Sequence, residues 1–182
     1  MVIETQRLRL QSPHEVSASS VYDYYFTNQN FLKPFSPARE DSFYTIEHHA
    51  KTLHGQIEDW DKGIGYRFYI SLKNEKHHII GTIALSNIVR GTFLSCFLGY
   101  QLDEAHRNQG YMTEATTRIV DFAFRNLKLH RIEGNVIPRN DASRAVLEKC
   151  NFTMEGLSKK YLRINSVWED HLHYVLLNED LE

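Results

Sequence analysis

The feature that most restricts the fold of this chain is a glycine-containing turn between a strand pattern and a helix pattern. Residues 97–102 (FLGYQL) read as the end of a strand, which is followed by the turn at residues 106–110 (HRNQG). The apolar residues after the turn have helical spacing, and the expected buried face of this helix consists of Ala115, Ile119, Phe122 and Ala123. A helix leaves its first N–H groups unpaired, and its dipole is positive at that end. The turn at Gly110 is therefore predicted to bind a pyrophosphate, mostly through backbone amides.

The pattern around this turn predicts a mixed α/β fold (α+β in the wider sense) with one β-α-β crossover at its centre. Strands are expected at 8–11, 66–72, 78–87, 93–102, 130–136, 153–162 and 167–177, and helices at 13–28, at 42–61, after Gly110 and at 140–150. The helix at 42–61 is expected to bury one apolar stripe, formed by Ile46, Ala50, Leu53, Ile57 and Trp60. Residues 31–37, with two prolines, are expected to form a stiff irregular loop.

Composition limits the class of protein. The 182 residues, 42% of them hydrophobic and 24% charged, fit one soluble domain spanning 1–182. No apolar run is long enough to cross a membrane, and no signal segment opens the chain, so a cytoplasmic location without membrane contact is expected. A net charge of -2 argues against direct nucleic-acid binding. Cys96 and Cys150 are expected to be buried thiols rather than a disulfide framework.

A second motif lies about thirty residues after the turn. Residues 138–152 (PRNDASRAVLEKCNF) place Asn140-x-x-Ser143 at the start of a short helix. Asn140 is a good helix N-cap, and a capping role can coexist with ligand binding. The two motifs together favour a cofactor site over a plain strand-to-helix turn.

The chain resembles the GNAT family of acetyl-CoA-dependent N-acetyltransferases over nearly its whole length, from residues 5–10 (TQRLRL) to residues 167–171 (VWEDH). Residues 30–35 (NFLKPF), 86–91 (SNIVRG), 98–100 (LGY) and 129–132 (LHRI) are similar to the RimJ type, the ribosomal-protein-alanine N-acetyltransferases. The resemblance implies a mostly antiparallel seven-stranded sheet flanked by about four helices, and an acyltransferase that is a monomer or homodimer. Two residues depart from the family pattern: Met112 replaces Gly or Ala, and Asn151 replaces Gly at the end of the short helix.

The resemblance also implies roles for individual residues. The pyrophosphate of acetyl-CoA is expected on Arg107, Asn108, Gln109, Gly110, Tyr111, Met112 and Thr113. Asn140 is expected to contact the pantetheine arm, and the backbone N–H of Leu102 to stabilise the oxyanion. Ser143 is the candidate acid for the leaving thiolate, directly or through water.

The general base is the open question. Related N-terminal acetyltransferases have a Glu where this chain has Asn135, which cannot accept a proton, whereas Glu133 lies on the same strand face and could act through water. About a tenth of an α-amine is neutral at pH 7, against well under about a thousandth of a lysine amine. A site without a strong base therefore favours an N-terminal α-amine, and the expected acceptor is the N-terminus of a ribosomal protein beginning with Ala or Ser.

The expected acceptor groove consists of Phe31, Lys33, Pro34, Phe35 and Tyr100. No third ligand accompanies the histidine pairs, so no metal is expected. Two alternatives remain: acetylation of a small amine such as a polyamine or aminoglycoside, and a module that binds acetyl-CoA and a ribosomal protein without catalysis.

Overall fold

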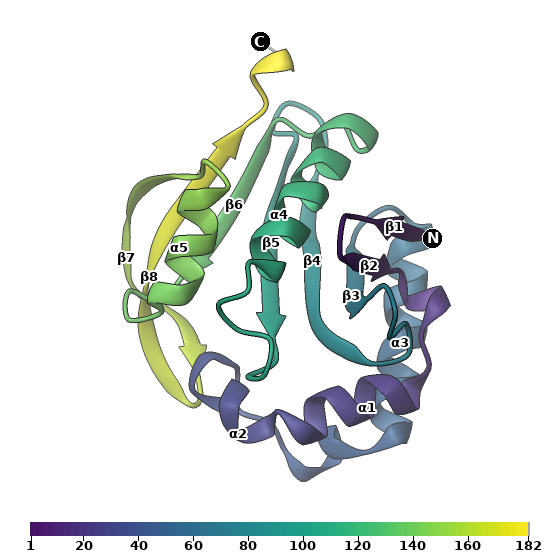
Figure 1. Ribbon diagram of the computed structural model, residues 1–182. Helices are drawn as coiled ribbons and strands as arrows, with labels where there is room; N and C mark the ends of the chain where they lie inside the picture. Colours follow the sequence, from purple (N-terminus) through teal and green to yellow (C-terminus); the bar gives the residue numbers. More distant parts are fainter. Residues whose placement is uncertain (182) are drawn as a thin grey trace.

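Eight strands form one sheet in the order β1-β2-β3-β4-β5-β6-β8-β7 in the computed structural model, which describes residues 1–181 (Figure 1). The strands are β1 (Val2–Glu4), β2 (Leu8–Gln11), β3 (Tyr66–Leu72), β4 (Ile79–Val89), β5 (Ser95–Leu102), β6 (Arg131–Val136), β7 (Thr153–Ile164) and β8 (Val167–Leu177). The α-helices are α1 (Ala18–Thr27), α2 (Gln29–Leu32), α3 (Ile46–Asp61), α4 (Tyr111–Asp121) and α5 (Asp141–Lys149).

The sheet is mixed as expected, because β5 and β6 pair in parallel and every other pair of neighbours is antiparallel. The predicted number of seven strands is one too few. The additional strand, β1, is three residues long and pairs with β2. Three residues are too few to display a period-two pattern, so no usable signal for this strand is present in the sequence.

Helices cover both faces of the sheet. Alternate residues of β3 point to opposite faces of the sheet. Phe68 and Ile70 pack in the main core, which also contains the buried side of α4. Tyr69 packs on the other face with residues of α1 and α3. The buried side of α4 and the turn after it is the one predicted from spacing, since Ala115 and Ile119 are fully buried. Figure 1 shows α4 and α5 side by side in front of the sheet, with α1 and α2 along its lower end.

Three predictions about the N-terminal helices were wrong in detail. The first helix begins at Ala18, after a 3-10 turn at Pro13–Glu15, because Ser17 caps it by accepting a hydrogen bond from the Ser20 N–H. The helix expected from residue 42 is a 3-10 turn, Asp41–Tyr44, followed by α3, which Thr45 caps. Residues 31–37 are not one irregular loop: α2 continues into a 3-10 turn at Lys33–Phe35, where Pro34 fits because the first turn needs no N–H donor.

The buried stripe of α3 also differs from the expected one. Ile46 and Ala50 are exposed, and His49 is buried together with Leu53. The His49 ring stacks on Tyr25 with an interplanar angle of 2°. Burial lowers the pKa of His49 to about 4, so the ring is neutral and packs as an aromatic group.

Two further expectations were confirmed. Asn151 adopts a left-handed conformation, with φ of 64°, directly after α5, which is how it replaces the usual glycine. Cys96 and Cys150 are both free and buried. Among residues 1–181, no helix combines the length and the apolar character that crossing a membrane requires.

Gly81 provides a test of the packing between β4 and β5. A Cβ at this position would lie 2.6 Å from the backbone oxygen of Gln101, so Gly81→Ala forces the two strands apart. We expect the free energy of unfolding in urea to fall by about 1–3 kcal/mol. Gly55→Ala is the control: nothing lies within 4 Å in this helix interior, and we expect stabilisation of about 0.5–1 kcal/mol. Equal urea midpoints of unfolding for Gly81→Ala and Gly55→Ala would contradict the close approach of these strands.

Candidate active site

The site is created where β5 and β6 separate. Their ladder is short, running from Ser95 opposite Arg131 to Leu98 opposite Gly134. Beyond those pairs, residues 99–102 of β5 do not pair with residues 135–137, which form the end of β6 and the position after it. The two segments instead line a cavity of about 850 Å³. The cavity is thus built into the middle of the sheet, between two strands that stay paired with their outer neighbours.

Backbone groups point into this opening. The Asp103 N–H donates to the Ile80 oxygen of β4 at 2.8 Å. Backbone groups alternate sides along a strand, so those of Tyr100 and Leu102 point away from β4 and into the cavity. The Leu102 N–H is therefore oriented as the expected oxyanion donor.

The turn before α4 has the geometry of an anion site. Gly110 is the N-cap of α4 in a left-handed conformation with φ of 78°, and no side chain caps this end of the helix. The Glu114 N–H donates to the Gly110 oxygen at 3.0 Å, which is the first intrahelical bond of α4. The N–H groups of residues 111–113 are left without helical acceptors, and these residues line the cavity.

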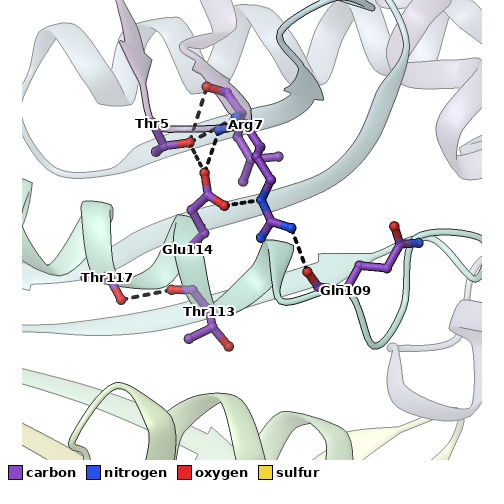
Figure 2. Close-up of polar contacts among 7 residues, drawn as sticks. Thr5, Arg7, Gln109, Thr113, Glu114 and Thr117 are labelled. Carbon is purple, nitrogen blue, oxygen red and sulfur yellow. Dashed lines mark hydrogen bonds and ion pairs between the residues drawn. The ribbon is translucent and has the colours of Figure 1, made fainter.

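A set of polar contacts holds this turn against the N-terminal hairpin (Figure 2). The Thr5 hydroxyl donates to Glu114 Oε1 at 2.6 Å, and Arg7 Nε donates to Glu114 Oε2 at 2.7 Å. Arg7 also donates from Nη1 to the Gln109 backbone oxygen at 2.9 Å and lies 4.4 Å from the centre of the Tyr111 ring. We call Thr5, Arg7 and Glu114 the hairpin clamp.

The clamp explains how a carboxylate is tolerated in the first turn of an anion-binding helix. Burial raises the pKa of Glu114, but the hydrogen bonds from Thr5 and Arg7 outweigh it and lower the pKa overall, so the group is ionised and its charge is balanced by Arg7. Sequence reasoning used residues 5–10 only as a family landmark and missed this role, because the partners are more than one hundred residues apart.

On the other side of the cavity, a hydroxyl of α5 is linked to a hydroxyl of β5. Asn140 caps α5, its Oδ1 accepting from the Ser143 N–H at 3.2 Å, which leaves its NH₂ group as a donor. Ser143 Oγ donates to the Tyr100 hydroxyl at 3.0 Å, and that hydroxyl donates to the Ser143 backbone oxygen at 2.9 Å. Burial raises the pKa of Tyr100, so it keeps its proton. Tyr100, expected in the acceptor groove, thus contacts the Ser143 side.

The structure brings most of the predicted site residues to one cavity. Those that line it are Phe31, Phe35, Tyr100, Leu102, Arg107, Asn108, Gly110, Tyr111, Met112, Thr113, Asn135, Asn140 and Ser143. The Arg107 guanidinium lies 5.1 Å from the centre of the Phe31 ring, which connects α2 to the turn.

Four predicted residues lie elsewhere. Glu133 is outside the cavity lining and accepts a hydrogen bond from Arg131 Nε at 2.8 Å. Gln109 contacts the hairpin clamp through its backbone oxygen. Lys33 lines a separate cavity of about 380 Å³, and the Pro34 oxygen accepts from Arg139 at 3.2 Å.

The two arginines near α5 are held by acidic partners. Arg139 pairs with Glu169 at 2.6 Å, and Arg144 pairs with Asp141 at 3.1 Å. Within residues 1–181, no group of three or more His, Cys, Asp or Glu side chains is placed to hold a metal ion.

A family model described as "Acetyltransferase (GNAT) domain" matches residues 7–153. The chain belongs to the GNAT acetyltransferase family. This membership agrees with the mixed sheet, the opening between β5 and β6 and the anion site at the start of α4.

Individual relatives cover most of the chain. It is 44% identical over 155 residues to "Probable N-acetyltransferase YjcK" of Bacillus subtilis, covering 85% of each protein. It is 36% identical over 180 residues to the "[Ribosomal protein uS5]-alanine N-acetyltransferase" of Escherichia coli, covering 98% of this chain and 91% of the relative. Among solved structures, Mycobacterium smegmatis RimJ in complex with CoA-disulfide superposes with a TM-score of 0.89 at 26% identity, over 99% of this chain and 88% of that one.

The hairpin clamp yields a test by paired substitutions. Arg7→Met leaves the Glu114 charge unbalanced beside the anion site, so we expect the KM for acetyl-CoA to rise about three- to tenfold. Adding Glu114→Gln removes that charge, and the double variant should recover part of the affinity. Arg9→Met, which removes the nearby Arg9–Glu4 ion pair instead, is the control and should leave this KM unchanged.

The pH dependence of stability gives an independent readout for the same variants. The pKa of Glu114 is lowered in the folded protein, so its contribution to stability is present above its usual value of about 4.3 and is lost as pH falls through the lowered value. The stability gap between the wild type and Arg7→Met should therefore narrow in acid. A gap that widened below pH 4 would contradict the clamp.

Proposed function

We propose that this GNAT enzyme uses acetyl-CoA to acetylate the N-terminal α-amine of a ribosomal protein that begins with Ala or Ser. The observation that carries the proposal is the cavity between β5 and β6, which joins an anion site, inward backbone donors and a pair of hydroxyls in one continuous space. The Escherichia coli relative, named for alanine acetylation of a ribosomal protein, supports the acceptor class.

The lining residues fit acetyl-CoA. Its pyrophosphate suits the free N–H groups of residues 111–113, with Arg107 and Asn108 beside them. The Asn140 NH₂ group can donate to a pantetheine amide, since its oxygen is occupied by the cap. This path leads the thioester toward the inward-facing N–H of Leu102, which would stabilise the oxyanion of the tetrahedral intermediate.

Tyr100 and Ser143 are proposed to return a proton to the leaving thiolate. The Tyr100 O–H can turn from the Ser143 backbone oxygen to the sulfur. As the Tyr100 oxygen gains negative charge, Ser143 Oγ continues to donate a hydrogen bond to it. This refines the expectation for Ser143: Tyr100 gives the proton, and Ser143 stabilises the resulting phenolate.

Within residues 1–181, no lining carboxylate of the cavity is free to deprotonate a lysine. Of the described residues that line it, Asp141 alone has a carboxylate, and this group pairs with Arg144. A weakly basic site serves an α-amine, with a pKa of about 7.7–8.0, much better than a lysine amine near about 10.4.

A peptide panel tests the acceptor class. We expect kcat/KM on a peptide that starts with Ala or Ser to exceed that on an acetyl-capped Lys peptide by about two orders of magnitude at pH 7, because an α-ammonium group has a much lower pKa than a lysine ammonium and gives up its proton more easily. Thiol release reports turnover, and spermidine is the small-amine control. Equal values for the α-amine and the lysine would contradict the proposal. Turnover on spermidine alone would assign the enzyme to small amines, and acetyl-CoA binding without turnover on any amine would make it a non-catalytic module.

Substitutions at the two hydroxyls test the proton donor. Tyr100→Phe should lower kcat about 10- to 100-fold with little change in the KM for acetyl-CoA, because binding does not use this hydroxyl. Ser143→Ala should lower kcat less, by under about tenfold, since it removes only the supporting hydrogen bond. A larger loss in Ser143→Ala than in Tyr100→Phe would reverse the assignment.

A further inference from the structure

His171 of β8 lies in the cavity, and nothing in the sequence motifs gave it a task. It is 3% exposed, and its side chain is one of those that line the opening between β5 and β6. The proposed chemistry lacks a general base, because Asn135 cannot accept a proton and Glu133 lies outside the cavity.

A single contact fixes the protonation of the His171 ring. Nδ1 lies 3.1 Å from the backbone oxygen of Glu169, and a carbonyl oxygen only accepts, so Nδ1 carries the hydrogen. In the neutral ring, Nε2 then has a lone pair. This Nε2 has no hydrogen-bond partner among residues 1–181.

A second unpaired acceptor lies on the same side of the sheet. Asn135 Oδ1 is buried and has no hydrogen-bond partner within the described part of the chain. Asn135 is opposite His173 in the β6–β8 ladder, and His171, two residues along β8, points to the same face. Diagonal neighbours of this kind lie about 7–8 Å apart, close enough for one group to bridge them.

We propose that His171 is the general base of the reaction and removes a proton from the acceptor's α-ammonium group, while Asn135 Oδ1 holds that group by a hydrogen bond. The inference rests on the proposed function. It matches the chemistry of the two atoms, because an ammonium group offers three N–H donors and both Nε2 and Oδ1 are acceptors without partners.

The reaction begins with a proton transfer. One proton of R–NH₃⁺ passes to His171 Nε2, and the freed amine forms the N–C bond to the thioester carbonyl. The C–S bond then breaks, and the leaving thiolate takes the proton of the Tyr100 hydroxyl. The nitrogen loses a second proton, and this proton restores the Tyr100 hydroxyl. The products are the acetylated amine, the free thiol and an imidazolium that releases its proton to water.

The surroundings of His171 keep it ready to accept a proton. Its titratable neighbours are Tyr161 of β7, whose ring centre is 5.6 Å away, and Glu169, Asp170 and His173 of β8. Burial lowers the pKa of His171 below its usual value, although the Glu169 oxygen and the two carboxylates act in the opposite direction. The imidazole is therefore neutral at pH 7.

The wild type and His171→Gln should differ in their pH profiles as well as in rate. With a base in the site, the ammonium form is productive, so kcat/KM for an Ala-starting peptide should be flat between about pH 6.5 and 7.8. Without it, only free amine reacts, and kcat/KM should rise nearly tenfold per pH unit in that range. We expect His171→Gln to lower kcat/KM about 100-fold at pH 6.5 but only about tenfold at pH 8.5.

His173→Gln is the matched control. His173 lies on the same face of β8 but bonds to Ser158 at 2.8 Å and does not line the cavity. It should keep the wild-type profile. Because a buried substitution can disturb folding, His171→Ala is the second variant: imidazole added to the assay should restore its turnover in proportion to concentration, with acetyl-CoA affinity unchanged throughout.

The outcomes distinguish failure of the base assignment from failure of the proposed function. If the wild type acetylates the peptide but His171→Gln loses rate equally at every pH and imidazole rescues nothing, the base assignment is overturned and the proposed function stands. If the wild type transfers acetyl to no α-amine, the proposed function fails, and the base assignment fails with it.

Discussion

The separation of β5 from β6 after four residue pairs is the constraint on which the rest of the site depends. Strands that separate leave backbone N–H and C=O groups without partners, and such groups are costly when buried unless something else binds them. Here a ligand can do so, because the Leu102 and Tyr100 backbones face an open cavity. The outer ladders, β4 with β5 and β6 with β8, hold the two strands apart at no cost to the rest of the sheet.

Three elements use this opening from different directions. The N-terminus of α4 faces it with free amides, α5 contributes Asn140 and Ser143, whose hydroxyl is paired with that of Tyr100, and β8 contributes His171 on the opposite face of the sheet. The two faces therefore divide the chemistry. In the proposed reaction, donors for the coenzyme and the leaving thiolate lie on the helix side, and acceptors for the amine lie on the other. The hairpin clamp then ties the start of the chain to the coenzyme side through Arg7 and Glu114.

Much of this arrangement could be predicted from the chain, and the successes share a cause. The Gly110 turn and the Asn140 cap are local features, in which neighbouring residues determine the backbone conformation, and the structure has both. The buried face of α4 follows from spacing alone. The errors have other causes: the burial of His49 depends on Tyr25 from another helix, and Pro34 was read as excluding a helical turn in which it in fact lies.

The sequence by itself determined the family resemblance, most of the strands and helices and the glycine turn before α4, because each has its signal within short segments of the chain. Only the tertiary structure decided which side chains share the cavity. It placed Glu133 outside, joined Tyr100 to Ser143 across 43 residues, and set His171 beside the opening with Nε2 unpaired. These placements depend on strand register and on the face that each residue takes, and a pairing shift of one position would move the side chains of a strand to the opposite face.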